Sequence, residues 1–142
     1  MVELRWEVSP VLRDLSEFQR KLENKSDLWD RLIENVIVRE IENIFATDGR
    51  GTWAPTQQDN PILRDTYRLF RSYTDVDSYI ATRESLTYGS DVDYAIFHER
   101  GTEVMPARPV LGLLEEDPAF EQQLLDETQS WIESIEREVF GR

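Results

Sequence analysis

Residues 28–45 read LWDRLIENVIVREIENIF, and the predicted core is built around them. Their apolar side chains recur at helical spacing over a broad stripe, which is typical of a buried helix. Ser26 and Asp27 are candidate caps at the start of this helix. Asp48-Gly49 follows it, at a place where glycine commonly ends a helix. The sequence therefore predicts a long buried helix that stops before Gly49.

Two further elements are predicted on the N-terminal side of this helix. Residues 2–8 alternate between apolar and charged side chains, which is typical of a half-buried strand. The apolar members are Leu4, Trp6 and Val8. Ser9-Pro10 then provides a cap and a proline in the first helical turn, and apolar residues at helical spacing continue to about Glu23. We therefore expect a strand and a first helix before the buried one.

The remainder of the chain predicts several short elements and one long helix. A polar loop at 49–61 precedes a short helix within 62–73, two short strands within 79–90, helical turns at 91–99 closed by Gly101, and an extended segment at 102–112. Asp117-Pro118 then caps a C-terminal helix with one apolar stripe. The predicted fold class is α+β, with two N-terminal helices, a small and mostly antiparallel sheet, and a long C-terminal helix.

Length and charge limit the possible functions. The chain has 142 residues and no cysteine, with 16 Lys and Arg against 29 Asp and Glu, which gives a net charge of −13. We expect a single domain, 1–142, without disulfides or thiol chemistry. The acidic excess argues against sequence-specific binding of nucleic acid, because attraction to phosphate requires a positive field. No apolar run approaches the roughly 20 residues that span a bilayer, so we expect no membrane partner.

The residues that could carry chemistry are few. His98 is the single histidine, and no second histidine or cysteine is present to complete a zinc site. Acidic pairs lie at 75/77, 91/93 and 115–117, but none has the continuation of a calcium-binding loop. We therefore expect no catalytic residue, no metal and no cofactor. A hydrolase or metal enzyme that uses His98 and an aspartate is the least favoured alternative.

Three groups of residues are candidates for contact with a partner or with another subunit. The polar loop carries a tryptophan, which is costly to leave exposed. The helix within 62–73 carries a stripe of arginines. The third group is the block at 94–101 together with the Pro-x-Arg-Pro segment near 106–112, which is stiff and so loses little entropy on docking. The candidates are Trp53, Pro55, Arg64, Arg68, Arg71, Tyr94, His98, Gly101, Pro106, Arg108, Pro109 and Leu111.

The order of these motifs resembles the phage virion morphogenesis family of tailed bacteriophages, whose members act in tail completion and head–tail joining. The resemblance covers about residues 10–135. It is carried by Trp53-Ala54-Pro55, Leu69-Phe70-Arg71-Ser72, Gly89, the Y-A-x-x-H-x-x-G block at 94–101, and Pro-Ala-Arg-Pro-Val-Leu-Gly at 106–112. The chain departs from the family at 56–60, which is polar where the family has a basic stretch, and at 60–63, which reads NPIL.

This resemblance implies a structural protein, not an enzyme, located in the virion neck or tail after assembly in the host cytoplasm. Copies would form a ring, with a hexamer as the expected size, and contact other neck, connector or tail-tube proteins. His98 would orient a turn, and Arg108 would anchor the proline-rich segment by charge-assisted hydrogen bonds. Residues 109–142, with two basic and nine acidic groups, would repel DNA from the passage. An acidic binding module or DNA mimic that captures a basic protein is the alternative function.

Overall fold

The structure is a computed structural model that describes residues 2–55 and 68–141. It is a roughly α+β arrangement, in which helices accompany a small two-stranded antiparallel sheet. The elements are α1 (Ser9–Glu23), α2 (Ser26–Leu32), a π-helical stretch (Ile33–Ile37), α3 (Val38–Ala46), α4 (Arg68–Thr74), a 3₁₀ turn (Val76–Ser78), β1 (Ile80–Ala81), β2 (Leu86–Thr87), α5 (Ala95–Arg100), α6 (Leu111–Glu115) and α7 (Pro118–Phe140).

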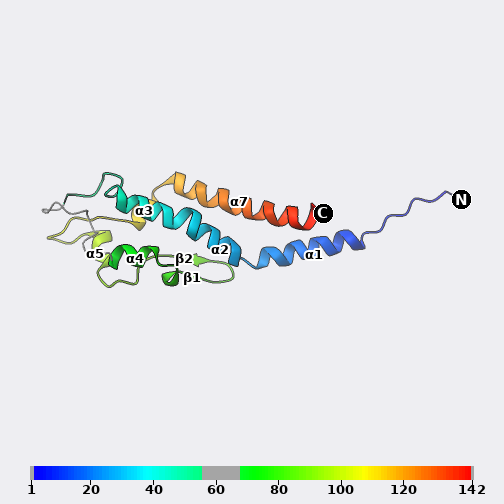
Figure 1. Cartoon of the computed structure of the whole chain (residues 1–142), viewed down its shortest axis with the longest axis horizontal. Helices are drawn as coiled ribbons and strands as arrows, with labels where there is room; N and C mark the ends of the chain where they lie inside the picture. The colour runs from blue at the N-terminus through cyan, green and yellow to red at the C-terminus, as the bar shows by residue number, and fades with distance from the viewer. Residues whose placement is uncertain (1, 56–67, 142) are drawn as a thin grey trace.

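The predicted buried helix is a composite element at the centre of the molecule. Helix α2, the π-helical stretch and α3 follow one another without a break, with α7 beside them and α4, α5 and the hairpin on the other side (Figure 1). The N-terminal region is therefore a first helix followed by this joined element, not two plain α-helices. Contact on two sides explains the broad stripe, since Ile37, Ile41 and Ile44 are each at most 1% exposed.

Helix α7 has the cap and the buried face that the sequence predicted. The Asp117 carboxylate accepts a hydrogen bond from the Ala119 amide at 2.9 Å, which satisfies one of the free N–H groups at the helix start. The buried side chains of the helix are Phe120, Trp131, Ile135 and Val139, with Leu124 half-buried. Leu125 lies outside this stripe and is exposed. The stripe is thus covered by the protein's own core.

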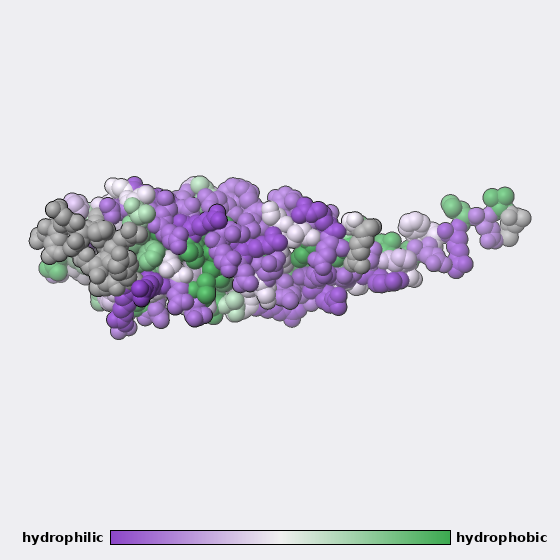
Figure 2. Space-filling view, viewed as in Figure 1, coloured by the Kyte–Doolittle hydropathy of each residue, from purple (hydrophilic) through white to green (hydrophobic). Residues whose placement is uncertain are grey.

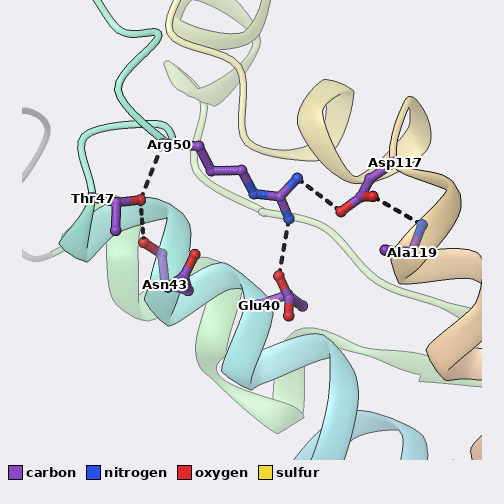
Figure 3. Close-up of polar contacts among 6 residues, drawn as sticks. All are labelled: Glu40, Asn43, Thr47, Arg50, Asp117 and Ala119. Carbon is purple, nitrogen blue, oxygen red and sulfur yellow. Dashed lines mark hydrogen bonds and ion pairs between the residues drawn. The ribbon is translucent and has the colours of Figure 1, made fainter.

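Arg50, which follows α3, links the first turn of that helix to the start of α7. The guanidinium of Arg50 contacts the carboxylates of Glu40 at 2.9 Å and Asp117 at 2.8 Å (Figure 3). The Arg50 amide donates to the Thr47 hydroxyl at 3.0 Å, and its backbone has a φ of 57°, in the left-handed region. No local pattern in the sequence marks this residue, because both of its acidic partners are separated from it along the chain.

The hairpin matches the two predicted strands, and the extended segment is shorter than predicted. Strands β1 and β2 pair antiparallel, with Ile80 opposite Thr87 and Ala81 opposite Leu86. The segment that was expected to be extended to residue 112 ends sooner, because α6 begins at Leu111. Of the short helix predicted within 62–73, the part before Arg68 lies outside the described residues. None of the described helices combines the length and apolar character that crossing a bilayer requires.

The predicted strand at residues 2–8 is wrong. This segment has no strand pairing and is exposed along its whole described length, with Leu4 at 101% and Trp6 at 78%. Alternation makes a segment suited to a sheet, but a strand also needs an edge with which to pair. Among the described residues the single sheet is the β1–β2 hairpin, and the N-terminal segment extends away from it (Figure 1).

Tyr79, beside the hairpin, predicts a loss of stability in alkaline solution. Its hydroxyl donates to the Tyr73 carbonyl at 3.0 Å, and burial, together with nearby Tyr88, raises its pKa to about 12. The unfolded chain releases this proton nearer the ordinary value of 10.0, so the free energy of unfolding should fall as the pH rises from 10 toward 12. Denaturant unfolding at stepped pH measures this fall. A Tyr79→Phe variant should lose less stability over that range, and an equal loss would contradict the assignment.

Candidate functional site

Three sequence motifs that lie far apart in the chain meet at one place. They are the WAP loop (residues 53–55), the α5 block (94–101) and the proline segment (106–112). The Trp53 indole N–H donates to the Pro109 carbonyl at 2.9 Å, which joins the first motif to the third. The Arg108 amide donates to the His98 carbonyl at 2.6 Å, which joins the third to the second. We call this meeting point the motif cluster.

Trp53 is buried, with its ring against α3 and its indole N–H bonded to the proline segment. It is 5% exposed, and its ring meets Phe45 of α3 edge-on at a centroid distance of 5.5 Å. Gly49 leaves room for the ring: its φ is +68°, and a Cβ there would clash with the indole of Trp53. These contacts correct the expectation that the indole itself faces a partner. The tryptophan in a polar loop is explained by packing within its own chain.

Arg108 anchors the proline segment to the WAP loop. The residue is 9% exposed, and its guanidinium donates to the Ala54 carbonyl at 3.0 Å and to the Pro55 carbonyl at 3.4 Å. Hydrogen bonds from a charged donor are stronger than those between neutral groups, so this side chain can fix two segments together. The resemblance implied such an anchor, and both carbonyl acceptors belong to the same chain as the arginine.

Glu99 is the central acceptor of the motif cluster, and no sequence pattern identified it. One carboxylate oxygen accepts from the amides of Val110 at 2.7 Å and Leu111 at 2.8 Å, and from the Tyr73 hydroxyl at 3.0 Å. The other accepts from the Gly112 amide at 3.3 Å. Helix α6 has no capping side chain at Val110, so Glu99 performs that role from α5. Burial and the nearby carboxylate raise the pKa of Tyr73, which keeps its hydroxyl a donor.

His98 contributes its backbone and a half-buried ring to the motif cluster. The ring meets Tyr94 edge-on at 5.7 Å, and no described residue bonds to Nδ1, which is buried. Burial and the neighbouring Arg108 lower the pKa of His98, against an opposing effect of Glu99. The ring is therefore mostly neutral at neutral pH. The proline segment meets His98 at its backbone, because the His98 carbonyl accepts from the Arg108 amide.

Gly101 is required by the sharp turn that follows α5. Its φ of +75° lies in the region that favours glycine, and a Cβ there would lie 2.8 Å from the Ala107 amide nitrogen. Any side chain would therefore push the proline segment away from α5. This close approach gives a physical reason for the glycine in the Y-A-x-x-H-x-x-G block.

The remaining candidate residues that the structure describes lie at or near the surface. Arg68 and Arg71 are exposed on α4, with the Arg68 guanidinium carbon 5.9 Å from the centroid of the Tyr94 ring. Arg64 lies outside the described residues. Pro55 and Pro106 are exposed, whereas Pro109 and Leu111 are half-buried. The exposed candidates therefore surround a cluster whose centre is buried.

The described residues contain no group of side chains that could hold a metal ion, and comparison with known proteins gives no indication of function. In residues 2–55 and 68–141, no three His, Asp or Glu side chains are grouped where they would hold a metal ion. The charged groups of the motif cluster act mainly on backbone atoms of the same chain. Comparisons with family models, curated proteins and solved structures found no match.

Proposed function

We propose that this protein is a structural component of the phage neck or head-proximal tail end, where copies assemble as a ring, with a hexamer as the expected size, to complete the tail and join it to the head. The observation that carries the proposal is the motif cluster. Hydrogen bonds join three of the motifs on which the resemblance rests, at residues 53–55, 94–101 and 106–112. Their Arg and Glu side chains bind backbone groups, as expected of a scaffold that holds a surface in shape.

The outline of the molecule supports assembly through two different surfaces. Figure 1 shows an elongated molecule, with α5 and the loops of the motif cluster toward one end and the N-terminal segment at the other. A closed ring needs a heterologous interface, in which one patch of a subunit meets a different patch of the next. A segment that projects from one end of an elongated subunit, and a patch on the body of the next subunit, suit such head-to-tail contact.

The acidic face of α7 fits a position near the DNA passage. Glu121, Glu133 and Glu136 are exposed on this helix. In a ring that turns α7 toward its lumen, these carboxylates would repel the phosphates of passing DNA. The same exposed acids favour the alternative of a module that captures a basic protein, because such binding depends on a concentrated negative surface.

Size measurement tests the proposed function directly. Light scattering on the purified chain over a range of concentrations should give a discrete oligomer, and cryo-imaging of that species should show a closed ring with α7 inward. A chain that stays monomeric at every concentration would overturn the proposal. A monomer that binds a basic protein, with affinity that falls steeply as salt is raised, would support the acidic module in its place.

A further inference from the structure

The N-terminal segment carries an exposed apolar surface that nothing in the described structure covers. We call residues 2–8 the N-terminal arm. Its apolar side chains range from 50% to 101% exposed, and those of the first turns of α1 from 45% to 58%. They are Val2, Leu4, Trp6, Val8, Val11, Leu12 and Leu15. Figure 2 shows apolar side chains on this protruding end, where a monomer gains nothing from exposing them.

The exposed surface continues the face by which α1 packs on α7. Phe18 is half-buried, and its ring lies 5.4 Å from that of Phe140, near the end of α7. Leu15 and Val11 precede Phe18 by three and seven residues, so they lie on the same side of the helix. Helix α7 therefore covers the stripe of α1 at Phe18. The earlier part of the stripe, at Val11 and Leu15, is not covered by any described residue.

A surface suited to the arm exists elsewhere on the same chain. The two outer edges of the β1–β2 hairpin pair with no other strand among the described residues. Beside the hairpin lies a surface groove of about 310 Å³. Its apolar lining comprises Trp29, Ile33, Val76, Tyr79, Ala81 and Leu86. An alternating segment added to a sheet edge gains backbone hydrogen bonds and places every second side chain on one face.

We propose that the N-terminal arm of one copy pairs with the hairpin edge of a second copy and places its apolar side chains in the groove beside it. This inference rests on the proposed self-assembly and names the contact that would drive it. A second copy suits the surface because each chain carries both halves of the contact, as a ring requires. Charge does not oppose the pairing: residues 2–23 hold four basic and five acidic groups, although the whole chain carries −13.

Directed cross-linking tests which chain receives the arm. The sequence has no cysteine, so introduced cysteines report without background from native thiols. A Trp6→Cys chain mixed with a Val76→Cys chain should form a covalent dimer under mild oxidation, because a disulfide needs close approach. Val104→Cys is the matched control, since that position is 96% exposed but does not line the groove. Equal cross-linking to the control would overturn the proposal, as would an internal disulfide in a chain that carries both Trp6→Cys and Val76→Cys.

A second experiment separates this inference from the proposed function. Leu4→Ser combined with Trp6→Ser should abolish the oligomer detected by light scattering. Glu3→Ser combined with Arg5→Ser changes the opposite face of the arm, leaves the net charge unaltered, and should assemble as the wild type does. If the Leu4/Trp6 variant still forms the wild-type ring, the arm contact is wrong and the proposed ring stands. If the wild type itself never assembles, the ring and the arm contact fail together.

Discussion

Replacing Trp53 with alanine is expected to lower the free energy of unfolding by about 3 to 5 kcal/mol, the range for deleting a buried aromatic side chain. The indole is 5% exposed, packs edge-on against Phe45, and donates to the Pro109 carbonyl. Its loss leaves a cavity between α3 and the proline segment, and a carbonyl without its partner. Denaturant unfolding followed by circular dichroism measures the change.

Trp53→Phe separates packing from the hydrogen bond. It keeps a ring against Phe45 and removes the indole N–H, so it should lose clearly less stability than Trp53→Ala. The exposed Val104→Ala substitution is the control and should change stability within about 0.5 kcal/mol. If Trp53→Ala fell within the range of Val104→Ala, the tryptophan would not hold the motif cluster together.

The elements that were predicted correctly are those that depend on residues close together in the sequence. The cap at Asp117 and the stripe of α7 follow from a few neighbouring residues, and the structure has both. The hairpin follows from two runs of β-forming residues separated by a polar turn at 82–85. The buried helix was found from its stripe, but its π-helical stretch was not, because the spacing of apolar residues does not distinguish a widened turn from a regular one.

Features that depend on distant residues could not be predicted in this way. The alternation in residues 2–8 was detected correctly, but a strand exists only where another strand lies beside it. Trp53 was singled out as a partner contact, but the direction of its side chain depends on Phe45 of α3 and on Pro109, which lies 56 residues further along the chain. Glu99 accepts from residues 11 to 13 positions ahead, so no helical or strand spacing marks it.

Replacing Glu99 with alanine should produce the second large loss of stability, of about 3 kcal/mol. The substitution removes the acceptor for three backbone amides at the start of α6 and for the Tyr73 hydroxyl. Tyr73 is 1% exposed, so water cannot readily replace the missing partner. A buried donor left without an acceptor costs about 1 to 3 kcal/mol, and the weakened cap of α6 adds to that cost. Thermal and denaturant unfolding measure the loss.

A double-mutant cycle distinguishes this account from a general sensitivity of α5 to substitution. In the wild type, Tyr73→Phe removes a hydroxyl that has a partner and should be destabilising. In the Glu99→Ala background the same change removes a hydroxyl that has lost its acceptor. The loss of unfolding free energy caused by Tyr73→Phe should therefore become smaller, or turn into a gain. Glu103→Ala, at an exposed acid a few residues away, controls for loss of charge and should be nearly neutral. Additive effects of Tyr73→Phe and Glu99→Ala would mean that the two side chains act independently, and the proposed capping geometry would then be incorrect.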